Sequence, residues 1–186
     1  MSRDIREYIQ PAELQAFYRR NPGRYVRDGV AIWLVILVAL AAAIRIDSVF
    51  VTVLAFVVIA GRQLALNNMV HEASHFLLAR DKQLNDLICD LFFAAPHLIS
   101  TDGYRTKHLP HHTHLGHPPE DVEFKARYLF RGSRFLWRSL WAFGGGTSLV
   151  TAASYGKGST NTANRFRSLG LVALTNGALL AYCWAL

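Results

Sequence analysis

Two long stretches near the start of the chain contain almost no charge. Residues 29–44 carry no charged side chain, and after the short Arg45-Ile46-Asp47 break, residues 48–70 carry only Arg62. At about 1.5 Å per helical residue, the second run crosses a hydrocarbon core of roughly 30 Å, and the first does so when extended slightly at each end. Two helices buried in a soluble protein would need a larger partner core than a chain of 186 residues supplies. We therefore predict an all-α, integral membrane protein that begins with a transmembrane hairpin.

The charges that flank the hairpin predict its orientation. Six arginines precede the first apolar run, whereas the break between the two runs holds one arginine and one aspartate. Basic residues concentrate in the cytoplasmic loops next to membrane spans. We therefore expect residues 1–28 to form a cytoplasmic N-terminal arm. Because a hairpin returns the chain to its starting side, the His-rich region after residue 70 is also expected in the cytoplasm.

The remainder of the chain belongs to the same predicted membrane domain, residues 29–186. Residues 87–100 are apolar but too short to span, and a proline and two polar residues interrupt them, so we expect them to lie along the membrane interface. Residues 135–154 are long enough to cross, but crossing would put three basic residues outside, so an interfacial position is favoured there too. Residues 169–186 carry no charge and predict a further span.

The composition excludes several other classes of protein. Hydrophobic residues make up 52% of the chain and charged residues 18%, which rules out a disordered polypeptide. The two cysteines, Cys89 and Cys183, lie far apart, so they indicate neither a disulfide scaffold nor an iron–sulfur cluster. We read them as ordinary buried thiols, and we expect no nucleic-acid partner.

The histidines are unusually clustered. Seven of the eight fall within residues 71–75 and 108–117. In the first window, His71 and His75 are four residues apart, which places both imidazoles on one face of a helix, as two metal ligands require. The same residues also match the His-Glu-x-x-His pattern, in which Glu72 would act as the general base of a zinc protease. This window by itself leaves both interpretations open.

The second window indicates more than one metal ion. It places five histidines within ten residues, from His108 to His117. A single zinc needs only one more protein ligand after the first pair, so five further imidazoles are too many for one tetrahedral ion and favour two ions. Sites rich in nitrogen ligands suit iron, copper or zinc. A solvated, His-rich, metal-scavenging loop is the remaining interpretation.

The two windows in this membrane context resemble the membrane fatty acid desaturases and their hydroxylase relatives. The segment His71 to His75 is similar to the first histidine box, HxxxH, of that family, and the segment His108 to His112 is similar to the second, HxxHH. Tyr104-Arg105 before the second box and Pro119-Glu120-Asp121 after it are also similar, and the resemblance covers roughly residues 25–186. It implies a di-iron (Fe) centre ligated by the box histidines, namely His71, His75, His108, His111 and His112.

The resemblance also implies the partners of the reaction. These are O2, an acyl lipid or fatty acyl substrate delivered by the membrane lipids, and an external electron donor of the ferredoxin, rubredoxin or cytochrome b5 type. A separate donor agrees with the sequence, which has neither a Gly-rich nucleotide-binding fingerprint nor a cysteine cluster. The sequence does not choose between desaturation and hydroxylation.

One feature departs from the family pattern. A third box should follow the later spans, but no histidine occurs after His117. We therefore expect the chain to be truncated before that box and to lack turnover on its own, with His114 and His117 in loop or supporting roles. Two alternatives stay open: a membrane zinc metalloprotease that uses the His-Glu-x-x-His residues, and a non-catalytic, metal-binding membrane remnant.

Overall fold

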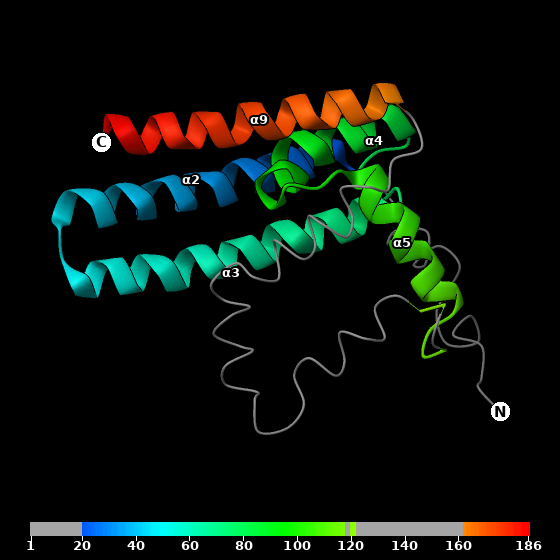
Figure 1. Ribbon diagram of the computed structural model, residues 1–186, viewed down its shortest axis with the longest axis horizontal. Helices are drawn as coiled ribbons and strands as arrows, with labels where there is room; N and C mark the ends of the chain where they lie inside the picture. The colour runs from blue at the N-terminus through cyan, green and yellow to red at the C-terminus, as the bar shows by residue number, and fades with distance from the viewer. Residues whose placement is uncertain (1–19, 118–119, 122–161) are drawn as a thin grey trace.

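The computed structural model describes residues 20–117, 120–121 and 162–186, and all regular structure in these ranges is helical, as predicted. Figure 1 shows three long helices side by side, with the shorter helices gathered at one end. The elements in chain order are α2 (Pro22–Ile46), α3 (Val49–Ser74), α4 (Lys82–Cys89), the π-helix η2 (Asp90–Ala94), the 3-10 helix η3 (Ala95–His97), α5 (Thr101–Thr113) and α9 (Thr162–Ala185).

Helices α2 and α3 form the predicted hairpin. The Asn21 side chain caps α2 by accepting a hydrogen bond of 3.2 Å from the Arg24 amide, and Pro22 occupies the first turn, where no amide hydrogen is needed. The helix ends at Ile46 and is followed by the capping residue Asp47, whose φ of 48° is left-handed, and α3 begins after Ser48. Helix α2 therefore begins before the apolar run at residue 29 and includes the last part of the expected arm.

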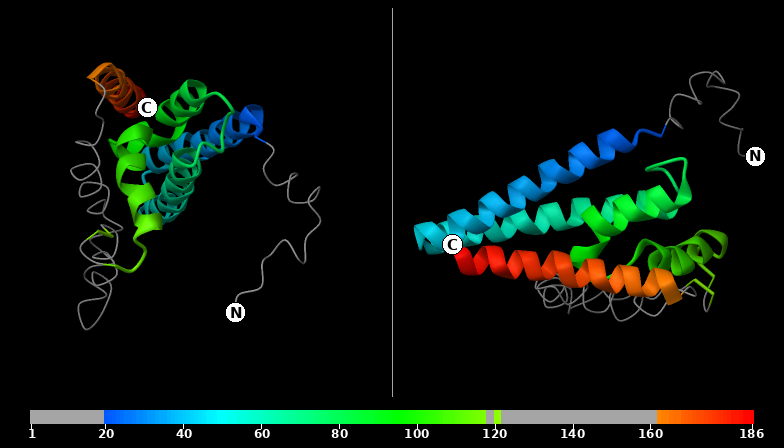
Figure 2. Two further views of the ribbon diagram at one scale, coloured as in Figure 1. Left: turned by 90° about the vertical axis from the view of Figure 1, so that its right-hand side faces the viewer. Right: turned by 90° about the horizontal axis from the view of Figure 1, so that it is seen from above.

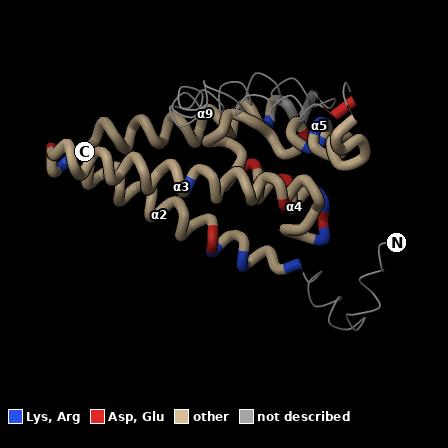
Figure 3. Tube along the Cα trace, turned by 90° about the horizontal axis from the view of Figure 1, so that it is seen from below, with Lys and Arg blue, Asp and Glu red and all other residues tan. Residues whose placement is uncertain are grey.

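Three of the described helices are long and apolar enough to cross a membrane: α2, α3 and residues Phe166–Ala185 of α9. Their charged residues lie mainly near the end occupied by α4 and α5 and at the hairpin turn (Figure 3). Helix α9 lies beside α2, where the Tyr182 hydroxyl donates to the Leu37 carbonyl oxygen over 3.1 Å. A third candidate span thus occurs where the sequence predicted one. The expected interfacial segment at 135–154 lies outside the described residues.

The apolar segment at residues 87–100 does not form a span. Its helical part continues α4 through η2 and η3, and the following residue, Leu98, has a left-handed φ of 59°. Phe93 at its centre is fully buried in the core that α2 and α3 help to form, and the Trp33 indole donates to the Phe92 carbonyl oxygen over 2.8 Å. Figure 2 shows this broken helix inside the group of long helices, at the end away from the hairpin turn. Tyr104 of α5 also belongs to this core, which therefore connects α5 to the hairpin.

The contact between Gly29 and Phe93 makes a testable prediction. A Cβ atom at Gly29 would lie 2.9 Å from Phe93 Cε1, whereas one at Gly61, which is also helical, would meet nothing within 4 Å. We expect Gly29→Ala to destabilise the fold by about 1–3 kcal/mol, because the buried ring has to move. Gly61→Ala, the matched control, should cause no loss, because alanine favours a helix. Thermal unfolding of both variants in detergent tests this, and equal melting temperatures would contradict it.

Candidate metal centre

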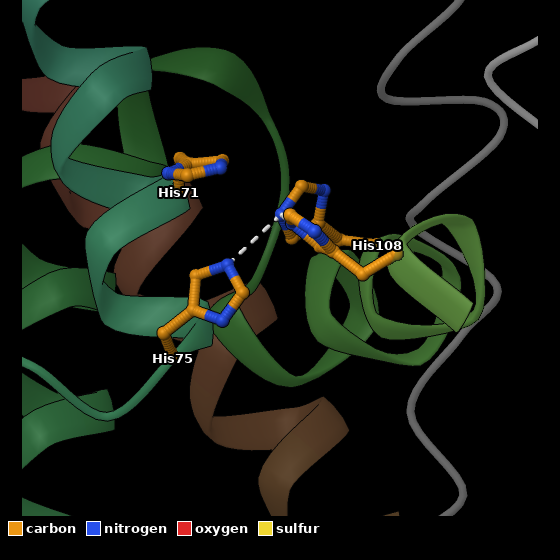
Figure 4. Close-up of side chains that lie close together, drawn as sticks. His71, His75 and His108 are labelled. Atoms are coloured by element: carbon orange, nitrogen blue, oxygen red, sulfur yellow. Dashed lines mark hydrogen bonds between the residues drawn. The ribbon is translucent and has the colours of Figure 1, made fainter. Parts of the chain in front are cut away.

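Four of the five predicted ligands come together between two helices. His71 lies in the last turn of α3, His75 is the residue that caps its C-terminus, and His108 and His112 lie on α5. One ring nitrogen of each histidine lies within 4.8 Å of those of the other three. In Figure 4 the rings from α3 and α5 face a common space. The i, i+4 spacing of each pair puts its two rings on one helical face, so α5 has only to pack across the end of α3.

The distances within this four-histidine cluster fit the ligands of a metal ion. His75 Nε2 lies 3.2 Å from His108 Nε2, which lies 2.9 Å from His112 Nε2. Imidazole ligands at about 2.0–2.1 Å from one ion place neighbouring nitrogens roughly 3 Å apart. In a neutral imidazole, Nε2 either donates one hydrogen or accepts one. His108 Nε2 therefore cannot form good hydrogen bonds with both other Nε2 atoms at once. A shared cation satisfies all three.

The electrostatic environment of His75 favours the metal-binding form. Burial lowers the pKa of its imidazole, and the neighbouring His71 and His112 lower it further. The neutral ring, which is the form that ligates a metal, is therefore the stable form of this residue at neutral pH.

The C-terminal carbonyls of α3, which carry no intrahelical partners, are all satisfied around the cluster. Phe76, in a left-handed conformation with φ of 57°, donates its amide to the Ala73 carbonyl oxygen, and the Leu77 amide reaches the Glu72 carbonyl oxygen. The Ser74 hydroxyl donates to the His71 carbonyl oxygen over 2.6 Å. Arg105 of α5 donates to the carbonyl oxygens of Ser74, over 3.0 Å, and of Ala73, over 3.2 Å. The end of α3 is thus tied directly to α5.

Two side chains of α4 complete this arrangement. Asp86 accepts two hydrogen bonds from the Arg105 guanidinium, one to each carboxylate oxygen. The buried Asn85 side chain donates to the Ala73 carbonyl oxygen over 2.9 Å and accepts from the Leu78 amide over 3.1 Å. Both residues therefore hold the chain that leaves α3 after His75.

The beginning of α5 is fixed by a buried carboxylate. Asp90 accepts hydrogen bonds from the Thr101 amide, over 2.8 Å, and hydroxyl, over 2.7 Å, at the first residue of α5. Arg167 and Ser168 of α9 both approach the other carboxylate oxygen to 3.3 Å. Burial raises the pKa of Asp90, while the Thr101 hydrogen bonds and the Arg167 charge lower it. The residue joins α9 to the helix that bears the second histidine box.

The fifth predicted ligand, His111, lies beside the cluster but has a different partner. Its Nδ1 lies 2.6 Å from Oδ1 of Asp121, a buried carboxylate whose other oxygen accepts the Gly116 amide over 2.8 Å. A carboxylate that holds Nδ1–H leaves Nε2 unprotonated, which is typical of metal-binding histidines. The His111 ring centroid is 6.0 Å from that of His108. The four-histidine cluster does not include His111.

The remaining histidines have other surroundings. His114 and His117 are exposed at the end of α5 and beyond it, in agreement with the loop role expected for them. His97, in η3, is buried and forms a hydrogen bond with the backbone of Gln63, and its Nε2 has no partner among the described residues. Of the cysteines, Cys89 is buried and Cys183 half-buried, and neither forms a disulfide.

The residues that position the histidines carry little signal in the sequence. Asp86 and Asp121 lie in polar stretches of the sequence, where an acidic residue is more often solvated than paired, and their spacing gives no signal of the contacts that they make across helices. Asp90 carried one signal, namely an acid inside an otherwise apolar stretch, because a buried charge has to be paired.

Comparison with known proteins agrees with this geometry. The profile of the fatty acid desaturase family matches residues 47–186, which include all the box histidines. Searches of curated proteins and of solved structures gave no match. With three candidate spans, two histidine boxes that meet at the end of α3, and a family match over most of its length, the chain belongs to the fatty acid desaturase family.

Proposed function

We propose that the protein acts in the O2-dependent desaturation or hydroxylation of acyl lipid chains, as a di-iron membrane oxygenase. The observation that carries this proposal is the convergence of His71, His75, His108 and His112, with ring nitrogens within 4.8 Å of one another, in a chain of the desaturase family. His111, oriented by Asp121, would complete the set of box ligands. Bound iron would supply the O2 activation that removal of hydrogen from an unactivated methylene requires.

The chain's own residues would hold and orient the reaction site. The imidazoles bind iron through nitrogen, and the two boxes sit at the end of the long apolar helices. An acyl chain can approach that end from the surrounding lipid, so the membrane itself would deliver the substrate. Electrons would come from an external donor of the ferredoxin, rubredoxin or cytochrome b5 type.

The zinc protease interpretation is less well supported. A catalytic zinc commonly has three protein ligands and keeps a fourth position for water. Here two histidines of α5 join the His71 and His75 pair, so a tetrahedral ion would have no open position. The Glu72 carboxylate lies 3.6 Å from His71 Nδ1, and both side chains are 41% exposed. The non-catalytic alternative keeps the metal site and differs only in turnover.

Metal content distinguishes these possibilities. We expect the purified protein to bind iron, and His108→Ala, which removes the ring closest to two others, to lose most of it. His114→Ala is the matched control, because His114 lies on the same segment but is exposed and outside the cluster. Elemental analysis after loading with Fe²⁺ or Zn²⁺ provides the measurement. Preference for a single zinc, or equal iron loss in both variants, would contradict the proposal.

Turnover is a separate expectation. The proposed chemistry requires a fully ligated pair of irons, and five box histidines are few for two ions. We therefore expect residues 1–186, tested alone with iron, a reductase, an electron carrier, O2 and labelled acyl lipids, to give no multiple turnovers. Mass spectrometry of the lipids measures the product. Metal-dependent unsaturated or hydroxylated product would contradict this expectation and would direct attention to His114 and His117 as additional ligands.

We also propose that both ends of the hairpin, and with them the histidine boxes, face the cytoplasm, on the basis of the arginines that precede α2. In a background without Cys89 and Cys183, a single cysteine at Arg20 should react with an impermeant maleimide only from the cytoplasmic side, and one at Asp47 only from the opposite side. The reverse labelling pattern would show that this orientation is wrong.

A further inference from the structure

The guanidinium of Arg105 lies beside the four-histidine cluster but is not part of it. Only 11% of the Arg105 side chain is exposed, and its charge is paired with Asp86 of α4. Its Nε and Nη2 atoms donate to the carbonyl oxygens of Ser74 and Ala73, the residues immediately before His75. The guanidinium carbon also lies 3.9 Å from the centroid of the Phe76 ring, immediately after His75. Arg105 therefore contacts the chain on both sides of a predicted ligand.

The position of Arg105 on α5 links these contacts to the second box. Arg105, His108 and His112 are spaced three and four residues apart, so they lie along one face of α5. The guanidinium end of this face is anchored to the carbonyls of α3, and the next two turns carry the imidazoles that meet His71 and His75. Rotation or sliding of α5 would therefore break the Arg105 hydrogen bonds and separate the two histidine pairs together.

The contacts require an arginine rather than any cation. A planar fork donates to two carbonyls and a carboxylate at once, while its face stacks on a ring. Lysine would keep the charge that favours a helix C-terminus but has a single nitrogen to share among these acceptors. Phe76 is held in a left-handed conformation that is costly for a bulky residue, and the stacked guanidinium helps to stabilise it there.

From this geometry we propose that Arg105, oriented by Asp86, is a positioning residue that sets the register of α5 against α3 and thereby the affinity of the four-histidine cluster for its metal. The inference rests on the proposed function, because it needs the cluster to bind a metal. It assigns Arg105 no contact with substrate. Loss of its hydrogen bonds leaves all four imidazoles in place on their helices but relaxes the distance between the two pairs.

Titration of the purified full chain with Co²⁺, followed by visible absorbance, tests the inference. Positioning contacts of this kind change metal affinity by about 10- to 100-fold. We expect Arg105→Gln and Arg105→Lys both to weaken Co²⁺ binding within that range and to change the absorption spectrum, with helical content unchanged by circular dichroism. Arg80→Gln, the matched control, removes an exposed arginine from the segment between α3 and α4 and should bind as the wild type does.

A double-mutant cycle with Asp86 shows whether the two residues act together. We expect Asp86→Asn to weaken binding less than Arg105→Gln, and the double variant to be no weaker than Arg105→Gln, because the carboxylate acts through the guanidinium.

The outcomes separate this inference from the proposed function. If the wild type binds no Co²⁺ or Fe²⁺, the proposed metal centre is wrong. If the wild type binds and Arg105→Lys keeps wild-type affinity and spectrum, the positioning role is overturned. Should Arg105→Gln fail to fold, Arg105→Lys, which keeps the charge, decides the question by the same measurement.

Discussion

The end of α3 is the constraint on which the rest of the described structure depends. A helix that ends inside a protein leaves carbonyl groups without intrahelical partners, and burying them unpaired is costly. Here the partners come from the Ser74 hydroxyl, the turn at Phe76, the Asn85 amide and the Arg105 guanidinium. Satisfying these backbone groups draws α4 and α5 onto the end of the hairpin. The same step brings the second pair of histidines over the first.

Helix α5 is fixed at more than one point, which matters because a metal site tolerates little displacement. Asp90 holds its first residue and connects it to α9. Arg105 holds its middle against α3, and Asp121 holds His111 near its end. Two of these three contacts involve a buried or nearly buried carboxylate. Each carboxylate is paired with cationic or hydrogen-bonding groups, as a charge removed from water has to be.

The two ends of the α2–α3 hairpin differ in how their apolar side chains are packed. About half of the large apolar side chains of α2 and α3 are exposed, which suits contact with lipid rather than with water. The main buried core instead lies near the histidines, around Leu66, Val70 and Phe93. This placement puts the buried core beside the four-histidine cluster and leaves the distal parts of α2 and α3 with many exposed apolar side chains.

The sequence by itself determined the helical class, the hairpin, the third apolar helix and the family, because each depends on local patterns: uninterrupted apolar runs, i, i+4 histidine pairs and box motifs. It also indicated four residues that do come together. It did not reveal that His111 pairs with Asp121 or that Asp90 joins three helices. Nor did it reveal that Arg105 donates hydrogen bonds to the carbonyl oxygens at the end of α3. These contacts link residues brought together only by folding, so no local spacing predicts them. Backbone carbonyls at a helix end have to find partners, and only the tertiary structure decided which side chains supply them.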